Sequence, residues 1–540
     1  MNIKRKITLL VTMLLSIVFV TIGQVNAETA DDQFIVGMEA GYPPFNWTQK
    51  TNANGAVPIE GTGDYAGGYD VEIAKRIAED LDKELVIVKT EWDGLTPALV
   101  SGKIDAIIAG MSPTEERKQS IDFSTPYYQS NYVMIVKRGG AFENATTLAD
   151  FSNAKVTAQL NTFHYSLIDQ IPNVKKQEAM ESFPSMRVAL QSGTIDAYVS
   201  EMPEGLSVEA VNDDFKMVEL TDGFQAEDSD RNIAVGLKKG NPLTPEINAA
   251  IDRITPEERL AFMEAAVKNQ PAISGVDESN TPWVVKIFKE NWRMFLKGAW
   301  VTLYISITGT VIGTVIGLGV GLVKTIPTPK KAAKRVGLKI ANILVTCYTE
   351  FFRGTPMIVQ AMVIYYGSAL AFGIDMNRIF AAIFIVSINT GAYMSEVVRG
   401  GIISIDKGQF EACQAIGMTH FQTMMNVVFP QVIRNILPAT GNEFVINIKD
   451  TSVLNVISVS ELYFATKTVA GSNFRYFETF FITLIIYFIM TTTVTQILRY
   501  IERRLEGPND YEMIHSDPLN SNSMAEVKKK IDSKEGATHE

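Results

Sequence analysis

The sequence predicts a two-lobed α/β domain followed by an all-α membrane domain of five helices. Three observations predict this order. A short apolar leader opens the chain, and a long water-compatible block then alternates strand-like and helical runs to about Asn280. Apolar runs long enough to cross a bilayer follow this block. We therefore expect a soluble domain on the outer side of a membrane, joined to a channel or carrier within it.

The leader has the three parts of a signal peptide, which we place at residues 1–27. Basic residues occupy positions 4–6, an apolar stretch runs from Ile7 to Ile22, and Ala27 is a small residue that a signal peptidase accepts. An uncleaved anchor helix is the alternative, and it would leave the following residues on the same side.

Composition excludes some classes of function. The formal net charge of -11 over 540 residues argues against nucleic acid as a partner. Both cysteines, Cys347 and Cys413, lie in the membrane block, so the outer domain can form no disulfide. The sequence contains no Gly-x-x-x-x-Gly-Lys-Ser/Thr motif for binding ATP phosphates. We expect no catalytic residues, no metal and no cofactor.

The outer block, residues 28–275, contains two segments of similar sequence, an internal echo. Residues 101–108 recur in kind at residues 192–199, each copy preceded by a helical run and followed by a turn with Met and Pro. Two lobes built alike would each present that turn at the carboxyl end of a strand, where open α/β sheets bind ligands. The cleft between the lobes is then the expected site, although such a plan also recurs by chance. The individual runs are strand-like at Phe34 to Met38, Leu85 to Val88 and Ala106 to Ala109, and helical at Val71 to Leu81.

The membrane block, residues 298–505, follows a linker and lead-in helix at residues 276–297. A helix needs about 20 apolar residues to cross the hydrocarbon. Charges interrupt two of the expected spans, with Glu396 ending one and Glu443, Lys449 and Asp450 lying within another. The five expected spans are residues 299–323, 354–374, 379–395, 436–462 and 479–498.

Basic residues set the orientation of these spans. The loop after the first span carries six of them, from Lys324 to Lys339, and no acid, which places it in the cytoplasm. Five crossings then place the polar tail at residues 506–540 inside as well, and we expect this tail to be disordered. The glycines from Gly309 to Gly321 lie in the first span, where they favour close helix packing.

The cytoplasmic loop at residues 399–435 contains a helical run ending in a glycine, and an apolar stretch ending in a proline. It resembles the EAA loop of ATP-binding-cassette (ABC) importer permeases, although Cys413 replaces the second alanine of that motif. The resemblance implies that this helix docks on a separate ATPase subunit, present in two copies, so the chain itself is no enzyme. An amphipathic helix lying on the bilayer is the alternative. The matching positions are Glu411, Ala412, Gly417 and Pro430.

Two further resemblances narrow the family. The stretches at residues 298–303, 348–356 and 447–452 look like permeases for polar amino acids. The outer block from Gln33 to about Ala272 is similar to extracytoplasmic amino-acid-binding proteins, as its segments at residues 36–45, 68–71 and 121–127 illustrate. This similarity implies a periplasmic-binding-protein-like fold of type II.

The same resemblance implies how the charges of an amino acid would be held. Gly110, Ser112 and Thr114 match the loop that meets the ligand, and Arg117 matches the arginine that takes the α-carboxylate as a bidentate partner. On a solvated helix face, Arg117 would instead pair with one of the two acids before it.

The opposing lobe supplies the remaining groups in this resemblance. Asn161 and Thr162 match a helix-start turn that adds N–H donors to the carboxylate, with asparagine standing where glycine is frequent. Glu201 occupies the position of the usual aspartate for the α-ammonium, one methylene longer. A surface acid after a strand is the alternative for Glu201.

The ligand's side chain is implied by three residues. Phe45 and Trp92 match an aromatic pair that sandwiches it, and Glu39 lies where a carboxylate would face its tip. Aromatic faces and an anion suit arginine, lysine or histidine, with glutamine, asparagine or glutamate as the alternative. We expect Tyr42 and Trp47 to be core residues instead.

The resemblances together predict the binding and membrane-spanning subunit of an ABC importer for a polar L-amino acid. We expect a multi-pass protein of the plasma membrane that pairs with a second copy through its membrane domain. A receptor tied to its permease suits a Gram-positive cell, which has no outer membrane. An amino-acid-gated ion channel or a secreted enzyme on the same binding fold are the alternatives from other classes.

Overall fold

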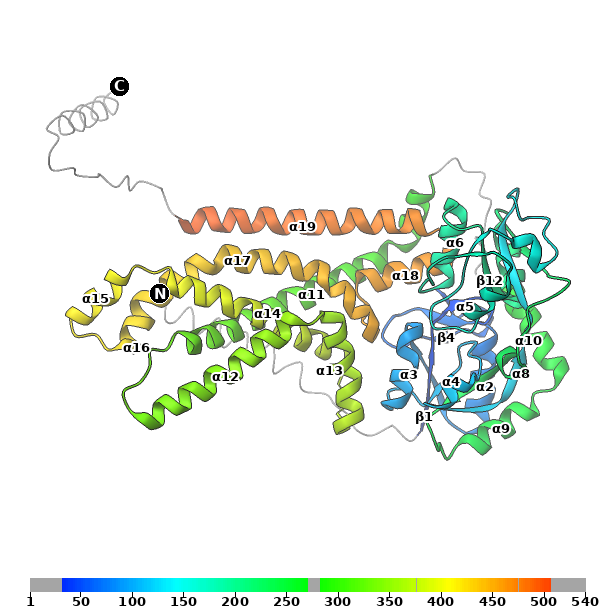
Figure 1. Ribbon diagram of the computed structural model, residues 1–540, viewed down its shortest axis with the longest axis horizontal. Helices are drawn as coiled ribbons and strands as arrows, with labels where there is room; N and C mark the ends of the chain where they lie inside the picture. The colour runs from blue at the N-terminus through cyan, green and yellow to red at the C-terminus, as the bar shows by residue number, and fades with distance from the viewer. Residues whose placement is uncertain (1–31, 271–281, 375, 474, 507–540) are drawn as a thin grey trace, which may run out of the picture.

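The computed structural model describes residues 32–270, 282–374, 376–473 and 475–506. The α/β lobes lie at one end of the long axis and a bundle of long helices occupies the rest (Figure 1). The predicted signal peptide, part of the linker and nearly all of the predicted tail lie outside the described residues.

The first lobe is built on a five-stranded sheet of order β6-β1-β7-β14-β8. Strand β1 runs parallel to both neighbours, with Met38 opposite Lys89 and Gly37 opposite Ile107. The carboxyl ends of three strands therefore meet at one edge of the sheet. The strands are β1 (Gln33–Met38), β6 (Glu84–Lys89), β7 (Ala106–Ile107), β8 (Asp122–Gln129) and β14 (Asn232–Leu237).

The second lobe has a sheet of order β11-β10-β12-β9-β13, in which β10 and β12 run parallel. Ser130 and Asn131 carry the chain from β8 into this lobe, and the chain returns at Arg231 just before β14. The Ser130 N–H donates to the Arg231 carbonyl oxygen at 2.9 Å, which ties the two crossings together. The strands are β9 (Tyr132–Lys137), β10 (Lys155–Thr157), β11 (Lys175–Lys176), β12 (Ala197–Glu201) and β13 (Phe215–Val218).

The internal echo corresponds to equivalent parts of the two lobes. Its first copy joins α3 to β7 and its second joins α6 to β12, and each strand lies beside a parallel partner. The predicted strands and helix lie within two residues of the observed bounds. The helices are α2 (Tyr69–Asp80), α3 (Trp92–Val100), α4 (Glu115–Lys118), α5 (His164–Leu167), α6 (Phe183–Ser192), α7 (Met202–Val211), α8 (Asp228–Arg231), α9 (Thr244–Arg253) and α10 (Pro256–Asn269).

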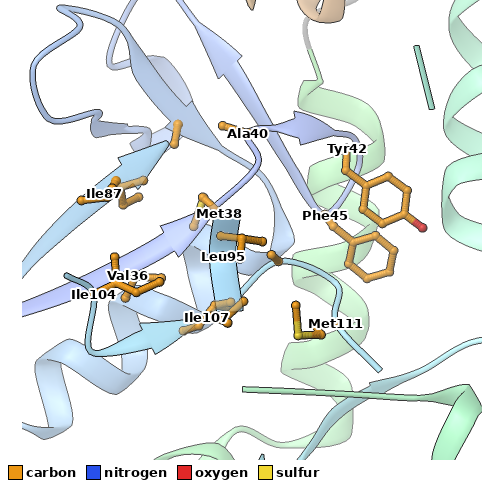
Figure 2. Packing of buried hydrophobic residues seen from close by; sticks show 14 of the residues in the cluster. Val36, Met38, Ala40, Tyr42, Phe45, Ile87, Leu95, Ile104, Ile107 and Met111 are labelled. Atoms are coloured by element: carbon orange, nitrogen blue, oxygen red, sulfur yellow. The ribbon is translucent and has the colours of Figure 1, made fainter. Parts of the chain in front are cut away.

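The core of the first lobe runs up to the edge of its sheet where the parallel strands end. Figure 2 shows Val36 and Met38 of β1 among Leu95, Ile104 and Ile107, with the rings of Tyr42 and Phe45 beyond the end of the strand. A small sheet over this edge carries both rings. Its strands are β2 (Gly41–Tyr42), β3 (Asn46–Gln49), β4 (Val57–Pro58) and β5 (Tyr65–Gly67).

The membrane domain begins with α11 (Trp283–Thr325), a single helix of 43 residues. The predicted lead-in helix and the predicted first span are therefore continuous. The other long helices are α12 (Ala332–Gly354), α13 (Met357–Phe372), α14 (Arg378–Ile403), α17 (Phe429–Asp450), α18 (Leu462–Asn473) and α19 (Tyr476–Glu506).

The count of five spans is not reproduced by length and composition. Among the described residues, α11, α14 and α19 are long and apolar enough to cross a bilayer, and α12 with α13 makes a fourth if this bent pair is one span. That pair bends by 112° at Pro356, because a proline lacks the N–H for a helical bond and disfavours helix in the residue before it. The expected span at residues 354–374 is thus only the second half of a broken element.

The expected span at residues 436–462 is also interrupted. Helix α17 ends at Asp450, a 3₁₀ turn (η5, Thr451–Ile457) follows, and α17 is not among the helices that qualify by length and composition. Helix α17 nevertheless packs against α11, α14 and α19 within the bundle (Figure 1).

Helices α11 and α14 make the most intimate contact of the bundle. Four glycines of α11, one turn apart, face α14, and a Cβ on any of them would lie 2.5 to 2.7 Å from an α14 side chain. The expectation of close packing at these glycines is confirmed. The pairs are Gly309 with Val386, Gly313 with Thr390, Gly317 with Met394 and Gly321 with Val398.

We predict that Gly317→Ala separates the two helices. The added methyl would lie 2.5 Å from the Met394 Cβ and 2.9 Å from the Ser395 backbone nitrogen, which cannot move aside as a flexible side chain would. Overpacking costs about 1–3 kcal/mol, so the midpoint of thermal unfolding of the full chain in detergent should fall. Gly319→Ala is the matched control, since nothing lies within 4 Å of its Cβ position. Equal losses in both variants would contradict the packing role.

Candidate functional site

The candidate site is the cleft between the lobes, at the facing carboxyl ends of their parallel strands. Seven of the ten residues expected to bind ligand line it. Thr114 and Asn161 line an adjoining outer groove, which also includes Trp92 and Arg117. The cleft is lined by Glu39, Tyr42, Trp92, Gly110, Ser112, Arg117, Gln159, Thr162, Phe163, His164, Phe183 and Glu201.

Arg117 bridges the two lobes at the start of α4. Its guanidinium donates to the Ser112 carbonyl oxygen in the first lobe and to the Asn161 carbonyl oxygen in the second, each at 2.9 Å. It also lies over the Trp92 ring, 5.2 Å from the centroid. Burial lowers its pKa to about 10, which leaves the guanidinium charged at neutral pH. Its hydrogen bonds point into the cleft, whereas Glu115 pairs with Lys118.

Glu201 lies at the end of β12, directly opposite. It is 2% exposed, so it is not a surface acid. The Tyr42 hydroxyl donates a short hydrogen bond to its carboxylate, and the His164 Nε2 lies 3.3 Å away. Burial and the charge of Glu201 raise the pKa of Tyr42 well above its usual value, so the phenol stays neutral and donates.

The aromatic residues are arranged differently from the expectation. Phe45 is fully buried and lies behind Tyr42, whose ring stacks between Phe45 at 5.2 Å and Phe183 at 4.5 Å. Tyr42, expected in the core, therefore reaches the cleft, while Trp47 is buried as expected. Tyr42 ends β2 and Phe45 lies in the turn after it, and their order in sequence does not reveal which one faces the cleft (Figure 2).

Four other cleft residues were missed by the sequence reasoning. Gln159 follows β10, Phe163 and His164 lie at the start of α5, and Phe183 begins α6. Each stands where a strand ends or a helix starts at the cleft edge. The polar Gln159, two residues after the buried end of β10, was the available signal.

A buried network behind the cleft holds Gly110 in place. The Tyr127 hydroxyl accepts from the Gly110 N–H at 3.2 Å and donates to Asp70 at 2.8 Å, and the Asn46 amide donates to the same carboxyl at 2.7 Å. Gly110 has φ 64°, and a Cβ there would lie 2.9 Å from the Tyr42 ring, so only glycine fits.

Asp70 makes this network sensitive to pH. Burial raises its pKa to about 7 from the ordinary 3.8. The folded state therefore holds the proton more tightly than the unfolded state does. The resulting stabilisation is full below about pH 4 and is lost as the pH rises toward 7.

Glu39 follows β1 and occupies the floor of the cleft. Burial and the neighbouring Glu91 raise its pKa to about 7, while Lys467, Lys89 and a hydrogen bond with Gln159 act in the opposite direction. Lys467 belongs to the membrane domain, so the charge environment of this cleft residue includes the permease side.

The lobes contact the membrane domain directly beneath the cleft. Lys467 lies 2.5 Å from a carboxylate oxygen of Glu91, and the Lys297 Nζ donates to the Thr62 carbonyl oxygen at 2.7 Å. A hollow of about 270 Å³ lies between Trp92 at the cleft edge and the membrane domain. It is lined by Glu91, Trp92, Asp93 and Glu181 of the lobes and by Ile358, Ser452, Val453, Asn455, Val456, Tyr463 and Lys467 of the membrane domain.

The predicted coupling loop lies at the opposite end of the bundle from the lobes (Figure 1). Glu411 and Ala412 are exposed on α15 (Lys407–Ala415), and Gly417 follows that helix with φ 78°. Pro430 is the second residue of α17 and follows directly after a π-helical turn, Met424–Val428. The loop is shorter than expected, because α14 extends to Ile403 and a π-helical turn at residues 424–428 leads into α17.

We predict that Tyr127→Phe weakens the ligand loop. The change leaves the Gly110 N–H and the Asp70 carboxyl short of a partner, at a cost of about 1–3 kcal/mol. The unfolding midpoint and the affinity for amino acid should both fall, as thermal unfolding and calorimetry of the full chain would measure. Tyr128→Phe is the control, since its ring packs edge-on against Phe45 while its hydroxyl makes no hydrogen bond within the described parts of the chain. An unchanged affinity in Tyr127→Phe would contradict the supporting role.

Two families match this chain. Residues 34–265 match the bacterial extracellular solute-binding proteins, family 3, and residues 332–507 match the binding-protein-dependent transport system inner membrane component. A solved amino acid ABC transporter substrate-binding protein, AbpA of Streptococcus pneumoniae bound to L-arginine, is 25% identical with a TM-score of 0.38. That alignment covers 45% of this chain and 98% of the other.

Two relatives align with the membrane domain. The glutamine transport system permease protein GlnP of Escherichia coli is 37% identical over 214 residues, which cover 39% of this chain and 93% of the relative. The arginine transport system permease protein ArtQ of Bacillus subtilis is 34% identical over 160 residues, 30% of this chain and 73% of the relative. The chain belongs to the polar amino-acid ABC importers, as a solute-binding domain and a permease domain joined in one polypeptide.

Proposed function

We propose that the cleft binds a basic L-amino acid, arginine, lysine or histidine, and that the permease domain carries it inward. The observation that supports this choice most is Glu39, a carboxylate on the cleft floor in the same cavity as the aromatic face of Trp92. Carboxylates and aromatic faces both attract cations, and the attraction is stronger where water is excluded.

The charges of the amino acid's backbone have matching partners. Arg117 would take the α-carboxylate, with Gly110, Ser112, Thr114 and the turn at residues 161–162 around it. Glu201 would take the α-ammonium. In the described conformation, Arg117 contacts carbonyl oxygens and Glu201 contacts Tyr42. Binding would therefore exchange hydrogen bonds in which one partner is charged for bonds to the ligand in which both partners are charged.

Glutamine is the second candidate, and a specific observation favours it. With a pKa of about 7, Glu39 is about half protonated at neutral pH, and a neutral amide side chain suits such a group. The relatives include one named for glutamine and one named for arginine. The two candidates differ in side-chain charge, which makes them separable by experiment.

Transport would need partners. We infer that two copies of a separate ATPase subunit dock on α15, whose Glu411 and Ala412 are exposed. Two copies of this chain would pair through their membrane domains in the plasma membrane, with the lobes outside and α15 in the cytoplasm. The basic residues from Lys324 to Lys339, at the end of α11, in the loop after it and in the first turns of α12, support this orientation.

We predict that Arg117→Ala removes amino-acid binding. Truncating one member of a desolvated charge pair costs about 2–5 kcal/mol, so affinity should fall by roughly 30-fold or more. Calorimetric titration of the full chain with all twenty amino acids measures both the loss and the preferred ligand. Arg253→Ala is the control, since that arginine pairs with Asp80 on the exposed surface of the first lobe. Intact affinity in Arg117→Ala would refute the site.

We further predict that arginine affinity rises with pH through the titration of Glu39. Its pKa of about 7 means that a bound cation must displace a proton at lower pH. The dissociation constant should fall by up to about tenfold per pH unit from pH 5 to 7 and then level off. Glu39→Gln should flatten this profile and weaken arginine more than glutamine. Tight binding of glutamine with no binding of arginine or lysine would favour the second candidate instead.

A further inference from the structure

Glu39 forms part of two cavities at once. One is the ligand cleft, and the other is a small cavity at the junction of the lobes with the permease. A carboxylate shared by both walls can respond to a ligand on one side and to the permease on the other. The junction cavity is lined by Glu39, Ala40, Gly41, Lys89, Glu91, Ser182, Pro184, Lys467, Thr468 and Tyr476.

The fold explains how these charges come together. Strands β1 and β6 run parallel with Met38 opposite Lys89, so Glu39 and Glu91 both emerge at the same sheet edge. Helix α18 of the permease lies against this edge. The Lys89 Nζ donates to the Thr468 hydroxyl of α18 at 2.7 Å, and Lys467 lies 2.5 Å from Glu91.

The junction excludes most water from these charges. The side chains of Lys467 and Glu91 are 14% and 19% exposed, and Lys89 lies over the Phe464 ring, 5.3 Å from its centroid. Coulomb interactions in such surroundings are several times stronger than in water. A charge contributed by the permease therefore changes the electrostatic potential at Glu39.

Docking changes the local balance of charge. The lobe alone brings two carboxylates, Glu39 and Glu91, and one ammonium, Lys89. Contact with α18 adds Lys467, so that two carboxylates face two ammoniums. A cationic ligand side chain at Glu39 meets an attractive site in the free lobe and a neutralised one in the docked lobe.

We propose that Lys467 of the permease is a release residue that lowers the affinity of the docked cleft for a cationic side chain. The proposal rests on the proposed function, because a neutral ligand would not respond to this charge. Lys467 acts through Glu39 and Glu91 and need not touch the ligand.

The test is the affinity of the full chain in lipid nanodiscs for arginine and for citrulline, its neutral isostere, at pH 8, where Glu39 is mostly ionised. Lys467→Met should tighten arginine threefold or more and leave citrulline unchanged, whereas Lys467→Arg should match the wild type. Lys297→Met is the matched control, since Lys297 also reaches the lobe, but at the Thr62 carbonyl oxygen. It should leave both affinities unchanged.

A charge-compensated variant separates electrostatics from loosened docking. Glu91→Gln combined with Lys467→Met removes one charge of each sign, so its preference for arginine over citrulline should return to that of the wild type. Two outcomes would overturn the release role. One is a double variant that binds arginine as tightly as Lys467→Met does. The other is a Lys467→Met variant whose preference for arginine over citrulline equals that of the wild type. Failure of the wild type to bind any basic amino acid would refute the proposed function, and the release role would fall with it.

Discussion

The parallel pairing of β1 with β6 and β7 is the constraint on which the site depends. Parallel strands end at one edge of a sheet, and here that edge carries Glu39, Glu91 and Gly110. The second lobe repeats the arrangement with β10 and β12, which end beside Gln159 and Glu201. Because the two edges face each other, residues distant in the sequence form one cleft. The permease docks against the same region and so meets the ligand machinery directly.

The charged side chains of the cleft have partners within the protein itself. Arg117 contacts two carbonyl oxygens, and Glu201 contacts Tyr42 and His164. A buried charge without a partner would be costly, so these contacts make the described conformation tenable. These contacts also limit the binding free energy. A ligand gains only the difference between the energy of its own contacts and that of the internal contacts it displaces. In the proposed site, selectivity would depend on the end of the cleft at Glu39, which has Glu91 and Lys467 nearby.

Residues within local motifs were predictable from the sequence. Gly110, Ser112 and Arg117 belong to one short segment, and the repeated helix, turn and strand correctly indicated two lobes. The families that match residues 34–265 and 332–507 confirm the expected combination of domains. Features set by long-range packing were harder to predict. The choice between Tyr42 and Phe45 depends on Phe183 of the other lobe, and the role of Lys467 depends on docking across 376 residues of sequence.

In the membrane domain, too, local features were easier to predict than long-range ones. The four glycines of α11 are close together in the sequence, and they correctly indicated close helix packing. The spans were less predictable, because counting apolar residues does not detect a bend such as the one at Pro356. Nor does counting reveal that the expected span at residues 436–462 is interrupted, since α17 ends at Asp450.

The glycine contact between α11 and α14 also has a mechanical meaning. Helix α11 has 43 residues and so extends about 65 Å, from the lobes at one end to the basic loop at the other. Its glycines bring α14 into direct contact along residues 309–321 of α11. Helix α14 continues through a short turn into α15. A displacement of α15 would therefore reach α11 through this contact, and through α11 the end of the bundle that meets the lobes.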